Sequence, residues 1–545
     1  TTFLLFFQSL RRLRPEPEGP AGASPRHVIA DMYAASVSGL PRLSALRSGA
    51  RRLATGHGEL DVAQTQTAAP GKYRTMEDLP GPSLATTAYW LFAKGYAEKT
   101  HVLQMEHKKI YGPMWRSKFG SFNVVNVASA ELISKVIRQE GQYPLRTDLP
   151  HWKEYLDLRG RAYGIHVSTG AEWYRLRSAL NPKMLKLKEV SAYAPVIHQV
   201  VGDLLQRLEV LRLRSKDRTT VSNLTELFYR FGFEGISTIL FETRLGCLQE
   251  EIPKDTLRFI AATNDMLSLS NSVLFFPQWT RGILPFWKDF VKAWDDLYDV
   301  AETLINKKME EIDSKLSRGK QVEGMYLTYL LSSGKLTKEE IYISITELLL
   351  GGVDTTSNTL SWTLYHLAQD MDVQEQLHNE VTSVCPGQQL PNIEDLKRMP
   401  YMKAIIKEIL RLYPVVPGNG RLVTEKEVIL DNYWFPEKTQ FHLCHFAASH
   451  DESEFPDAER FIPERWLRGT PTQSQHHPYS SIPFGVGVRA CVGKRVAELE
   501  MYFLLSRLVQ RYKVKPGEAM TTIEPKTRTL LIPGNPINLK FIPRV

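Results

Sequence analysis

The sequence has little cysteine. Its 545 residues include four, at Cys247, Cys385, Cys444 and Cys491. No two of them have the spacing of a zinc or iron–sulfur site, and four thiols in a chain this long do not make a disulfide framework. This sparseness favours a reducing compartment. A cysteine with a function in this chain therefore acts alone.

Long apolar runs are missing as well. No stretch approaches the roughly 20 consecutive apolar residues that a membrane-spanning helix needs. The net charge is only mildly positive, at +8, and no basic run with interleaved aromatic residues predicts a nucleic-acid site. With 43% hydrophobic and 23% charged residues, the composition is that of a chain with a large buried core.

The first 72 residues differ from the rest. No acidic residue lies between Asp31 and Glu59, while arginine and serine are frequent, and apolar residues from Leu43 to Leu53 recur at helical spacing. An arginine-rich, acid-poor amphipathic segment is typical of a mitochondrial presequence, the alternative being a basic tail without fixed structure. We expect residues 1–72 to be a presequence and flexible lead.

Residues 73–545 contain no linker, repeat or low-complexity segment, which predicts one domain. Its patterns indicate a mainly α fold with a small β part. We expect helices at 87–111, 172–188, 195–213, 223–240, 286–316, 337–370 and 393–413, and another after Cys491. Strand signals lie at 120–127, 422–430 and 439–444, with a C-terminal hairpin around Pro533-Gly534.

One glycine-rich loop, PFGVGVRACVG, presents Cys491 just ahead of a helical run. The thiol is therefore expected near a helix N-terminus, whose dipole favours a thiolate. A lone thiolate in an apolar pocket is the strong axial ligand that haem iron takes, and Arg489 has the reach to contact a haem propionate. The alternative is a buried, inert cysteine in a turn.

The loop pattern F-x-x-G-x-R-x-C-x-G, from Phe484 to Gly493, resembles the haem-ligand signature of the cytochrome P-450 superfamily. The resemblance extends over residues 73–545. It implies a single-domain cytochrome P-450 fold around a buried haem b. It also implies that Cys491 is the axial ligand of the haem iron and that Phe484, Gly485 and Arg489 bind the cofactor.

Three more residues resemble propionate contacts of that family. Trp173 and Arg177 have the spacing W-x-x-x-R in EWYRLR, and Arg421 follows in PGNGRL. The resemblance implies that all three bind the cofactor. An amphipathic surface helix is the alternative for the first two.

A further likeness concerns Glu408 and Arg411, the E-x-x-R of KEILR, and Arg465 in FIPERW. A Glu/Arg pair three residues apart on a helix is commonly a surface pair. In the family that the chain resembles, these three residues form a buried triad. That triad supports the haem-binding core and does no chemistry.

The long apolar helix contains LLLGGVDTTSN, with two glycines followed by Asp354 and Thr355. The family resemblance implies that Gly351 and Gly352 open a groove for O2. Asp354 and Thr355 would then act as an acid–alcohol pair that delivers the protons needed to break the O–O bond. The alternative is a kinked core helix whose threonine hydroxyl bonds to a carbonyl one turn back.

Four basic residues point to a redox partner: Lys403 and Lys407 on one helix, and Lys494 and Arg495 after the cysteine. Solvated charge is the ordinary interpretation. Resemblance to the mitochondrial members of the family implies a docking face for adrenodoxin, an acidic 2Fe–2S ferredoxin that receives electrons from NADPH through adrenodoxin reductase.

The aromatic stretch Asn271–Trp287 separates two predicted helices. It favours a peripheral contact with the matrix-facing side of the inner mitochondrial membrane, with Trp279 and Trp287 near the interface. Ordinary core packing is the alternative.

The segment PFGVGVRACVGKRVAELEM resembles the mitochondrial sterol 27-hydroxylase and vitamin D hydroxylase family. Within it, likeness to the retinoid-desaturating member implies that all-trans-retinol is desaturated at C3–C4 to 3,4-didehydroretinol, with some retinoid hydroxylation. The alternatives are side-chain hydroxylation of a sterol or vitamin D and, in a different class, a thiolate-haem sensor or a reductase-independent isomerase. Substrate-pocket candidates are Gly351, Val415, Val416, Pro417, Gly418 and Asn419.

Overall fold

Helices dominate the chain, as the spacing of its apolar residues requires. The computed structural model describes residues 73–119, 122–147, 149–318, 324–423, 426–518 and 520–544. The predicted presequence lies outside these ranges, so both that prediction and the boundary at residue 73 stay predictions.

The longer helices occur in chain order as α3 (Thr100–Tyr111), α4 (Ala130–Arg138), α5 (Pro150–Arg159), α6 (Gly170–Leu185), α8 (Ala194–Arg214), α9 (Leu224–Phe241), α10 (Lys254–Phe275), α11 (Pro285–Ser317), α13 (Lys338–Gln369), α14 (Met371–Val384), α16 (Pro400–Leu412) and α18 (Lys494–Arg511). Short ones are α2 (Leu84–Ala88), α7 (Leu187–Ser191), α12 (Leu327–Ser333), α15 (Ile393–Lys397) and α17 (His445–Ser449). Irregular turns are η3 (Met76–Asp78), η4 (Tyr89–Ala93), η5 (Tyr96–Glu98), η6 (Gln278–Gly282) and η7 (Pro463–Trp466).

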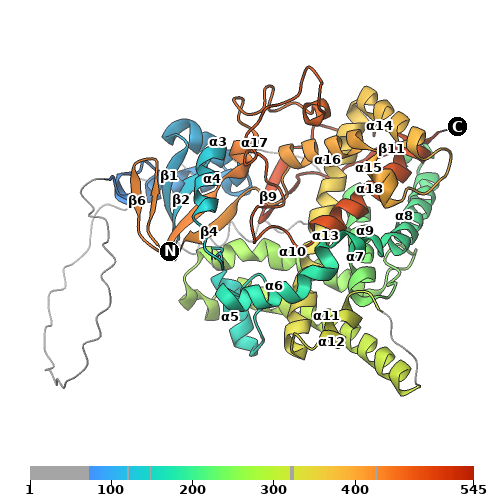
Figure 1. Cartoon of the computed structure of the whole chain (residues 1–545), viewed down its shortest axis with the longest axis horizontal. Helices are drawn as coiled ribbons and strands as arrows, with labels where there is room; N and C mark the ends of the chain where they lie inside the picture. Colours follow the sequence, from blue (N-terminus) through green and yellow to red (C-terminus); the bar gives the residue numbers. More distant parts are fainter. Residues whose placement is uncertain are drawn as a thin grey trace, which may run out of the picture. The chain divides into compact units, whose positions relative to one another are not determined.

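Strands form four small sheets among the described residues. The largest has the order β1-β2-β7-β4, from β1 (Met114–Phe119), β2 (Phe122–Val127), β7 (Thr439–Leu443) and β4 (Asn419–Val423), in which only β2 and β7 run parallel. The others pair β5 (Val428–Leu430) with β6 (Tyr433–Phe435), β9 (Pro525–Arg528) with β10 (Leu530–Pro533), and β11 (Leu539–Pro543) with β3 (Thr220–Val221) and β8 (Tyr512–Pro516). Figure 1 shows β1, β2, β4 and β6 gathered on one side, with α3 and α4 beside them, while most helices lie on the other.

The core helix is α13, which packs closely against α9. A Cβ on Gly232 of α9 would lie 2.8 Å from the Ser357 hydroxyl oxygen, and a Cβ on Gly352 would lie 2.7 Å from Cγ1 of Ile236. Because real Cβ atoms do not approach this closely, the two glycines are what allow the helices to meet. This close contact fixes the position of the middle of α13 relative to α9.

Four long helices confirm their predictions to within one residue at each end: α8, α9, α11 and α13. Two other helices were predicted too long. The segment 87–111 is divided into α2, η4, η5 and α3, because Gly95 adopts a left-handed conformation (φ +75°). Likewise, 393–413 is divided into α15 and α16, since Pro400 begins a new helix.

The predicted C-terminal hairpin around Pro533-Gly534 is wrong. The chain instead reverses at Thr529, whose φ of +62° places it in the left-handed region, so that β9 pairs with β10. The following strand, β11, pairs with β8 and β3. The turn signal was real, but it marks the exit from one hairpin and not its tip.

Candidate functional site

The loop before α18 holds Cys491 in a fixed turn. Gly485 and Gly487 have φ values of +67° and +69°, which favour glycine. The Cys491 N–H donates to the Phe484 carbonyl (2.8 Å). Phe484 and Gly485 thus belong to the turn that presents the thiol.

The sulfur of Cys491 lies at the start of α18, whose N-cap is Gly493. Burial raises the pKa of this thiol, while the backbone N–H groups of Gly493 and Lys494 and the guanidinium groups of Arg177 and Arg146 lower it. A sulfur that is screened from water and faces N–H donors and cationic groups is well placed to become a thiolate when a metal ion binds it.

Four arginines gather beside this loop. Arg489 donates to the carbonyl of Pro144 (2.7 Å) and stacks 3.7 Å above the Trp173 ring, and Arg177 donates to the Ala490 carbonyl (2.5 Å). Arg146 donates to the Arg489 carbonyl (2.9 Å), and Arg421 pairs with Glu140. These contacts join the predicted residues on α6, β4 and the cysteine loop.

This cluster carries more positive charge than the chain neutralises. Burial and the neighbouring guanidinium groups lower the pKa of Arg146 to about 10 and that of Arg489 to about 9. Glu140 is the single carboxylate that acts against them, and Nε of Arg146 is buried without a partner. Such a site calls for anionic groups from outside the chain, and the two propionates of haem fit that requirement.

Glu408, Arg411 and Arg465 lie together and buried. Arg411 makes a bidentate pair with the Glu408 carboxylate (2.7 and 2.9 Å), and Arg465 donates to the same group (2.9 Å). The indole of Trp466 (2.8 Å) and the N–H of Ile462 (3.2 Å) add two more donors to that carboxylate. A buried carboxylate with this many donors ties α16 to η7.

Midway along α13 the buried face opens. Between residues 341 and 368, the residues that are not buried are Gly351, Gly352, Thr355 and His366. A Cβ on Gly351 would meet nothing within 4 Å, whereas one on Gly352 would strike Ile236. Only the first of the two predicted groove glycines therefore faces open space; the second serves helix packing.

The predicted acid and alcohol point to different partners. Thr355 donates its hydroxyl hydrogen to the Gly351 carbonyl (2.8 Å), which is the back-bonded arrangement considered above as the alternative. Burial raises the pKa of Asp354 to about 6, and the Tyr229 phenol lowers it. Among the hydrogen bonds of the described chain, none joins the side chains of Asp354 and Thr355 directly.

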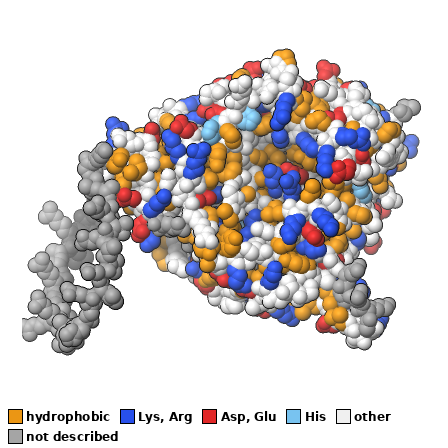
Figure 2. Space-filling view, viewed as in Figure 1, with side chains coloured by type: hydrophobic (Ala, Val, Ile, Leu, Met, Phe, Trp, Pro, Cys, Tyr) orange, Lys and Arg blue, Asp and Glu red, His pale blue; other side chains and the backbone are white. Residues whose placement is uncertain are grey.

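The four predicted docking bases converge on one carboxylate. Burial raises the pKa of the Glu498 carboxyl group, whereas Lys494 and Arg495, which lie 4.0 and 3.6 Å away, lower it together with Lys403 and Lys407. Glu380 is a second carboxylate near Lys403, so four bases face two acids and the patch remains positive. Lys407 is exposed, whereas Lys403 is half-buried, which lowers its pKa. Figure 2 shows Lys and Arg side chains gathered near the middle of one face.

The predicted substrate-pocket segment is tightly held. The Val415 carbonyl accepts from Leu531 N–H (2.7 Å), and that of Pro417 accepts from Phe446 N–H (3.1 Å). A Cβ on Gly418 would lie 2.2 Å from the His442 ring. Val415 is buried, and Val416 and Asn419 are half-buried.

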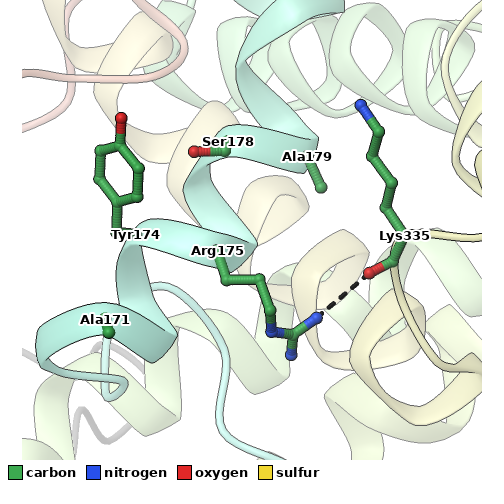
Figure 3. Close-up of a pocket in the computed structure, with 6 residues that line it drawn as sticks. All are labelled: Ala171, Tyr174, Arg175, Ser178, Ala179 and Lys335. Atoms are coloured by element: carbon green, nitrogen blue, oxygen red, sulfur yellow. Dashed lines mark hydrogen bonds between the residues drawn. The ribbon is translucent and has the colours of Figure 1, made fainter.

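A shallow pocket of about 450 Å³ lies elsewhere, on α6, and is lined by Ala171, Tyr174, Arg175, Ser178, Ala179 and Lys335. In Figure 3, Arg175 points to the Lys335 carbonyl, to which it donates a hydrogen bond (3.1 Å). None of its residues is a predicted site residue, and the buried Trp173 and Arg177 belong to another face of the helix. This pocket is separate from the cysteine site.

The aromatic segment between α10 and α11 departs from its prediction in one respect. Trp279 is 69% exposed in η6, but Trp287 is half-buried and stacks on Phe290 (5.7 Å). Ile283, 71% exposed, takes the outward position instead. The described residues contain no helix long and apolar enough to cross a membrane.

Sequence patterns did not single out Arg146, Glu140, Tyr229 or Glu498. Arg146, Glu140 and Tyr229 interact with residues far away in the chain, and Glu498 interacts with bases of both α16 and the start of α18. None of the four belongs to a local motif. The signals that identify these residues are an excess of buried guanidinium groups and an isolated buried carboxyl group. Both can be recognised only in a three-dimensional structure.

The described residues combine a mainly helical fold, a thiol at the start of a helix and four arginines that can bind an anionic cofactor. Together these features define the class of haem-thiolate proteins. The family model "Cytochrome P450" matches residues 79–541, and the chain belongs to that family. It is a P450 monooxygenase and, as such, uses haem held by a cysteine thiolate together with O2.

Similar curated proteins place the chain more narrowly. It is 44% identical to "Sterol 26-hydroxylase, mitochondrial" of Rattus norvegicus, over 87% of this chain and 90% of the relative. It is 39% identical to "Cytochrome P450 27C1" of Aquarana catesbeiana (91% and 93%), and 39% identical to "25-hydroxyvitamin D-1 alpha hydroxylase, mitochondrial" of Homo sapiens (86% and 93%). The protein is a mitochondrial P450 of this class, and its electrons come from adrenodoxin.

Proposed function

We propose that the protein hydroxylates the side chain of a sterol or a secosteroid such as vitamin D. The supporting observation is the 44% identity, across most of both chains, to a protein named as a sterol 26-hydroxylase. This reverses the order of the alternatives considered for the sequence, in which retinol came first. The named hydroxylases also weigh against a haem-thiolate sensor or isomerase.

In this proposal Cys491 provides the thiolate that ligates the haem iron, and Phe484 and Gly485 shape the loop around it. Arg177, Arg421 and Arg489, with Trp173 beneath Arg489, bind the propionates, and Arg146 joins them. Haem with a thiolate ligand supplies the activation of O2 and the oxidation of an unactivated C–H bond. The chain supplies charge neutralisation, since an anionic cofactor relieves the repulsion among the four guanidinium groups.

On α13, Asp354 and Thr355 move protons toward the opening at Gly351. A carboxyl group with a pKa of about 6 exchanges protons readily near neutral pH. The Thr355 hydroxyl, held by the Gly351 carbonyl, is fixed at the edge of that opening. Val415 and Val416 are proposed to contact the substrate.

Electron transfer is proposed to use the positive patch of Lys403, Lys407, Lys494 and Arg495. Two of these residues follow Cys491 within four positions, so an acidic ferredoxin bound there lies close to the thiol. Complementary charge would speed and orient this encounter.

Entry of a lipophilic substrate is proposed to occur where η6 meets the inner membrane. Trp279 and Ile283 are the exposed apolar side chains of this segment, and a side chain so exposed and apolar favours a lipid interface. A substrate dissolved in the bilayer would then not need to cross water.

The test is turnover of cholesterol, 25-hydroxyvitamin D3, retinol, retinal and retinoic acid with NADPH, adrenodoxin reductase and adrenodoxin, read by product mass. Gain of one oxygen on a sterol or secosteroid is the expected result. Loss of two hydrogens from retinol, with no sterol product, would replace this proposal with retinol desaturation. That second candidate is supported by the 39% identity to a 27C1 protein, whose name states no substrate.

A further inference from the structure

The segment between α5 and α6 contains a closed turn, residues 163–168, which we call the bridging turn. The Ser168 N–H donates to the Gly164 carbonyl (2.9 Å), and the Ser168 hydroxyl donates to the Tyr163 carbonyl (3.1 Å). The turn leads directly into α6, the helix of the W-x-x-x-R pair. Because its own hydrogen bonds close it, the bridging turn is positioned as one unit.

Glu347 of α13 holds one side of the bridging turn. Its Oε2 accepts from the His166 backbone N–H (3.0 Å), and Nδ1 of the His166 ring lies 3.2 Å from the same oxygen. The Glu347 side chain is only 1% exposed, and a hydrogen bond to a carboxylate is strong where water is excluded. Glu347 precedes Gly351 by one helical turn, so the bridging turn is anchored beside the opening in α13.

Gly164 provides the space for this contact. A Cβ on Gly164 would lie 2.3 Å from Oε2 of Glu347 and 2.4 Å from its Cδ, which is closer than real Cβ atoms approach. Gly164 has no positive φ, so a glycine is needed here for room and not for its backbone conformation. The carboxylate therefore lies directly against the bare backbone of the bridging turn.

The cysteine loop holds the other side of the bridging turn. Nη2 of Arg489 donates to the Ser168 carbonyl (3.4 Å), while its Nε donates to the Pro144 carbonyl. Arg489 is buried, precedes Cys491 by two residues and is one of the proposed propionate contacts. The bridging turn thus connects α13 with an arginine on the side of the thiol.

We propose that Glu347 is a positioning residue that anchors the bridging turn to α13 and thereby sets the orientation of Arg489 toward a haem propionate. The link runs from the Glu347 carboxylate through the backbone of His166 and Ser168 to the guanidinium group. The inference rests on the proposed cofactor-binding role of Arg489. It assigns a role to a carboxylate for which the sequence shows no motif.

The contact itself is tested with Gly164→Ala, Glu347→Ala and the double variant, each as haem-loaded protein. The added methyl group should displace the carboxylate and lower the melting temperature of the single variant. Once Glu347 is alanine, the methyl group has room, so the shift caused by Gly164→Ala should fall to roughly half or less. Equal shifts in both backgrounds would overturn the inference, because the two residues would then not be in contact.

The effect on the cofactor is tested by the rate of haem transfer to excess apomyoglobin and by the propionate bending band in resonance Raman spectra. Glu347→Ala should shift the band and speed haem transfer about threefold or more, as for the loss of a hydrogen bond to a charged group. Glu347→Gln should restore both values, since its amide oxygen still accepts from the His166 N–H.

Glu234→Ala is the matched control. Glu234 of α9 is also fully buried, and its carboxylate also accepts backbone N–H groups of a loop, those of Leu245 (3.2 Å) and Cys247 (2.8 Å). Its loss should lower the melting temperature but leave the propionate band and the haem-transfer rate unchanged. If Glu347→Ala does not fold, Gly164→Ala provides the same spectroscopic test, because it displaces the carboxylate.

Two results would overturn the positioning role: an unchanged propionate band in the variant that folds, or faster haem transfer without a shift of that band. The second would show a loosened fold and no effect on Arg489. None of these measurements needs a substrate, so an enzyme that oxidises no sterol or secosteroid contradicts the substrate proposal alone. If Arg489→Gln leaves the propionate band unchanged, the proposed role of Arg489 fails, and this inference fails with it.

Discussion

Two buried carboxylates on neighbouring core helices are treated in opposite ways. Glu408 on α16 accepts hydrogen bonds from Arg411, Arg465, Trp466 and the Ile462 backbone. The Asp354 carboxyl group on α13 is buried, and its Oδ2 has no hydrogen-bond partner. In the first arrangement several donors hold the carboxylate in place, and in the second one oxygen of the carboxyl group is left without a hydrogen bond.

The contrast separates scaffold from chemistry. Full satisfaction of buried polar groups makes the region around α16 rigid, and a proton cannot usefully move there. Incomplete satisfaction beside the Gly351 opening costs stability, and that cost is accepted where a reaction needs the group. The following variants probe the two regions.

Cys491→Ser should have the largest effect. Loss of the thiolate removes the proposed iron ligand, so the carbon-monoxide adduct of the reduced protein should lose the red-shifted band typical of sulfur ligation, and turnover should vanish. Cys444→Ser, which changes a buried thiol outside the loop, is the control. Retention of that band in the Cys491 variant would contradict the whole site assignment.

Glu408→Gln should come next and should act on stability instead of chemistry. It removes the charge that compensates Arg411 and Arg465, and breaking such a buried group costs about 3–5 kcal/mol. Chemical denaturation followed by circular dichroism measures this loss. Asp354→Asn, at the less satisfied carboxyl group, should destabilise far less while uncoupling turnover; equal destabilisation by both would remove the contrast drawn above.

Lys407→Glu should have the smallest effect of the three. Reversing one exposed charge in the docking patch should weaken the apparent affinity for adrenodoxin roughly tenfold at low salt and less at high salt. The carbon-monoxide spectrum should not change. Lys307→Glu on α11 is an exposed control outside the patch, whereas Glu498→Gln, which removes an acid that all four bases act on, should strengthen docking.

Much of the fold was predictable because its signals are local. The apolar spacing in α8, α9, α11 and α13 survives unchanged in the structure, and the cysteine loop has a motif of its own. Where prediction was wrong, a single residue decided the outcome: the left-handed Gly95, Pro400 at the start of α16, and the left-handed Thr529.

The site was predictable only in part, for a related reason. Glu408, Arg465 and Cys491 belong to recognisable motifs, and the structure shows the first two in contact. Tyr229 and Arg146 belong to no such motif, because the interactions that suggest a role for each of them are with residues on other segments of the chain. Long-range electrostatics of this kind leaves no pattern in the order of residues.

The close approach of α9 and α13 limits how this enzyme can be redesigned. Gly232 and Gly352 leave no room for even one added methyl group, so a larger residue at either position would push two core helices apart. A library aimed at new substrates should keep both glycines and vary the candidate pocket residues Val415, Val416 and Asn419. Tolerance to mutation is therefore expected to be lowest where α9 meets α13.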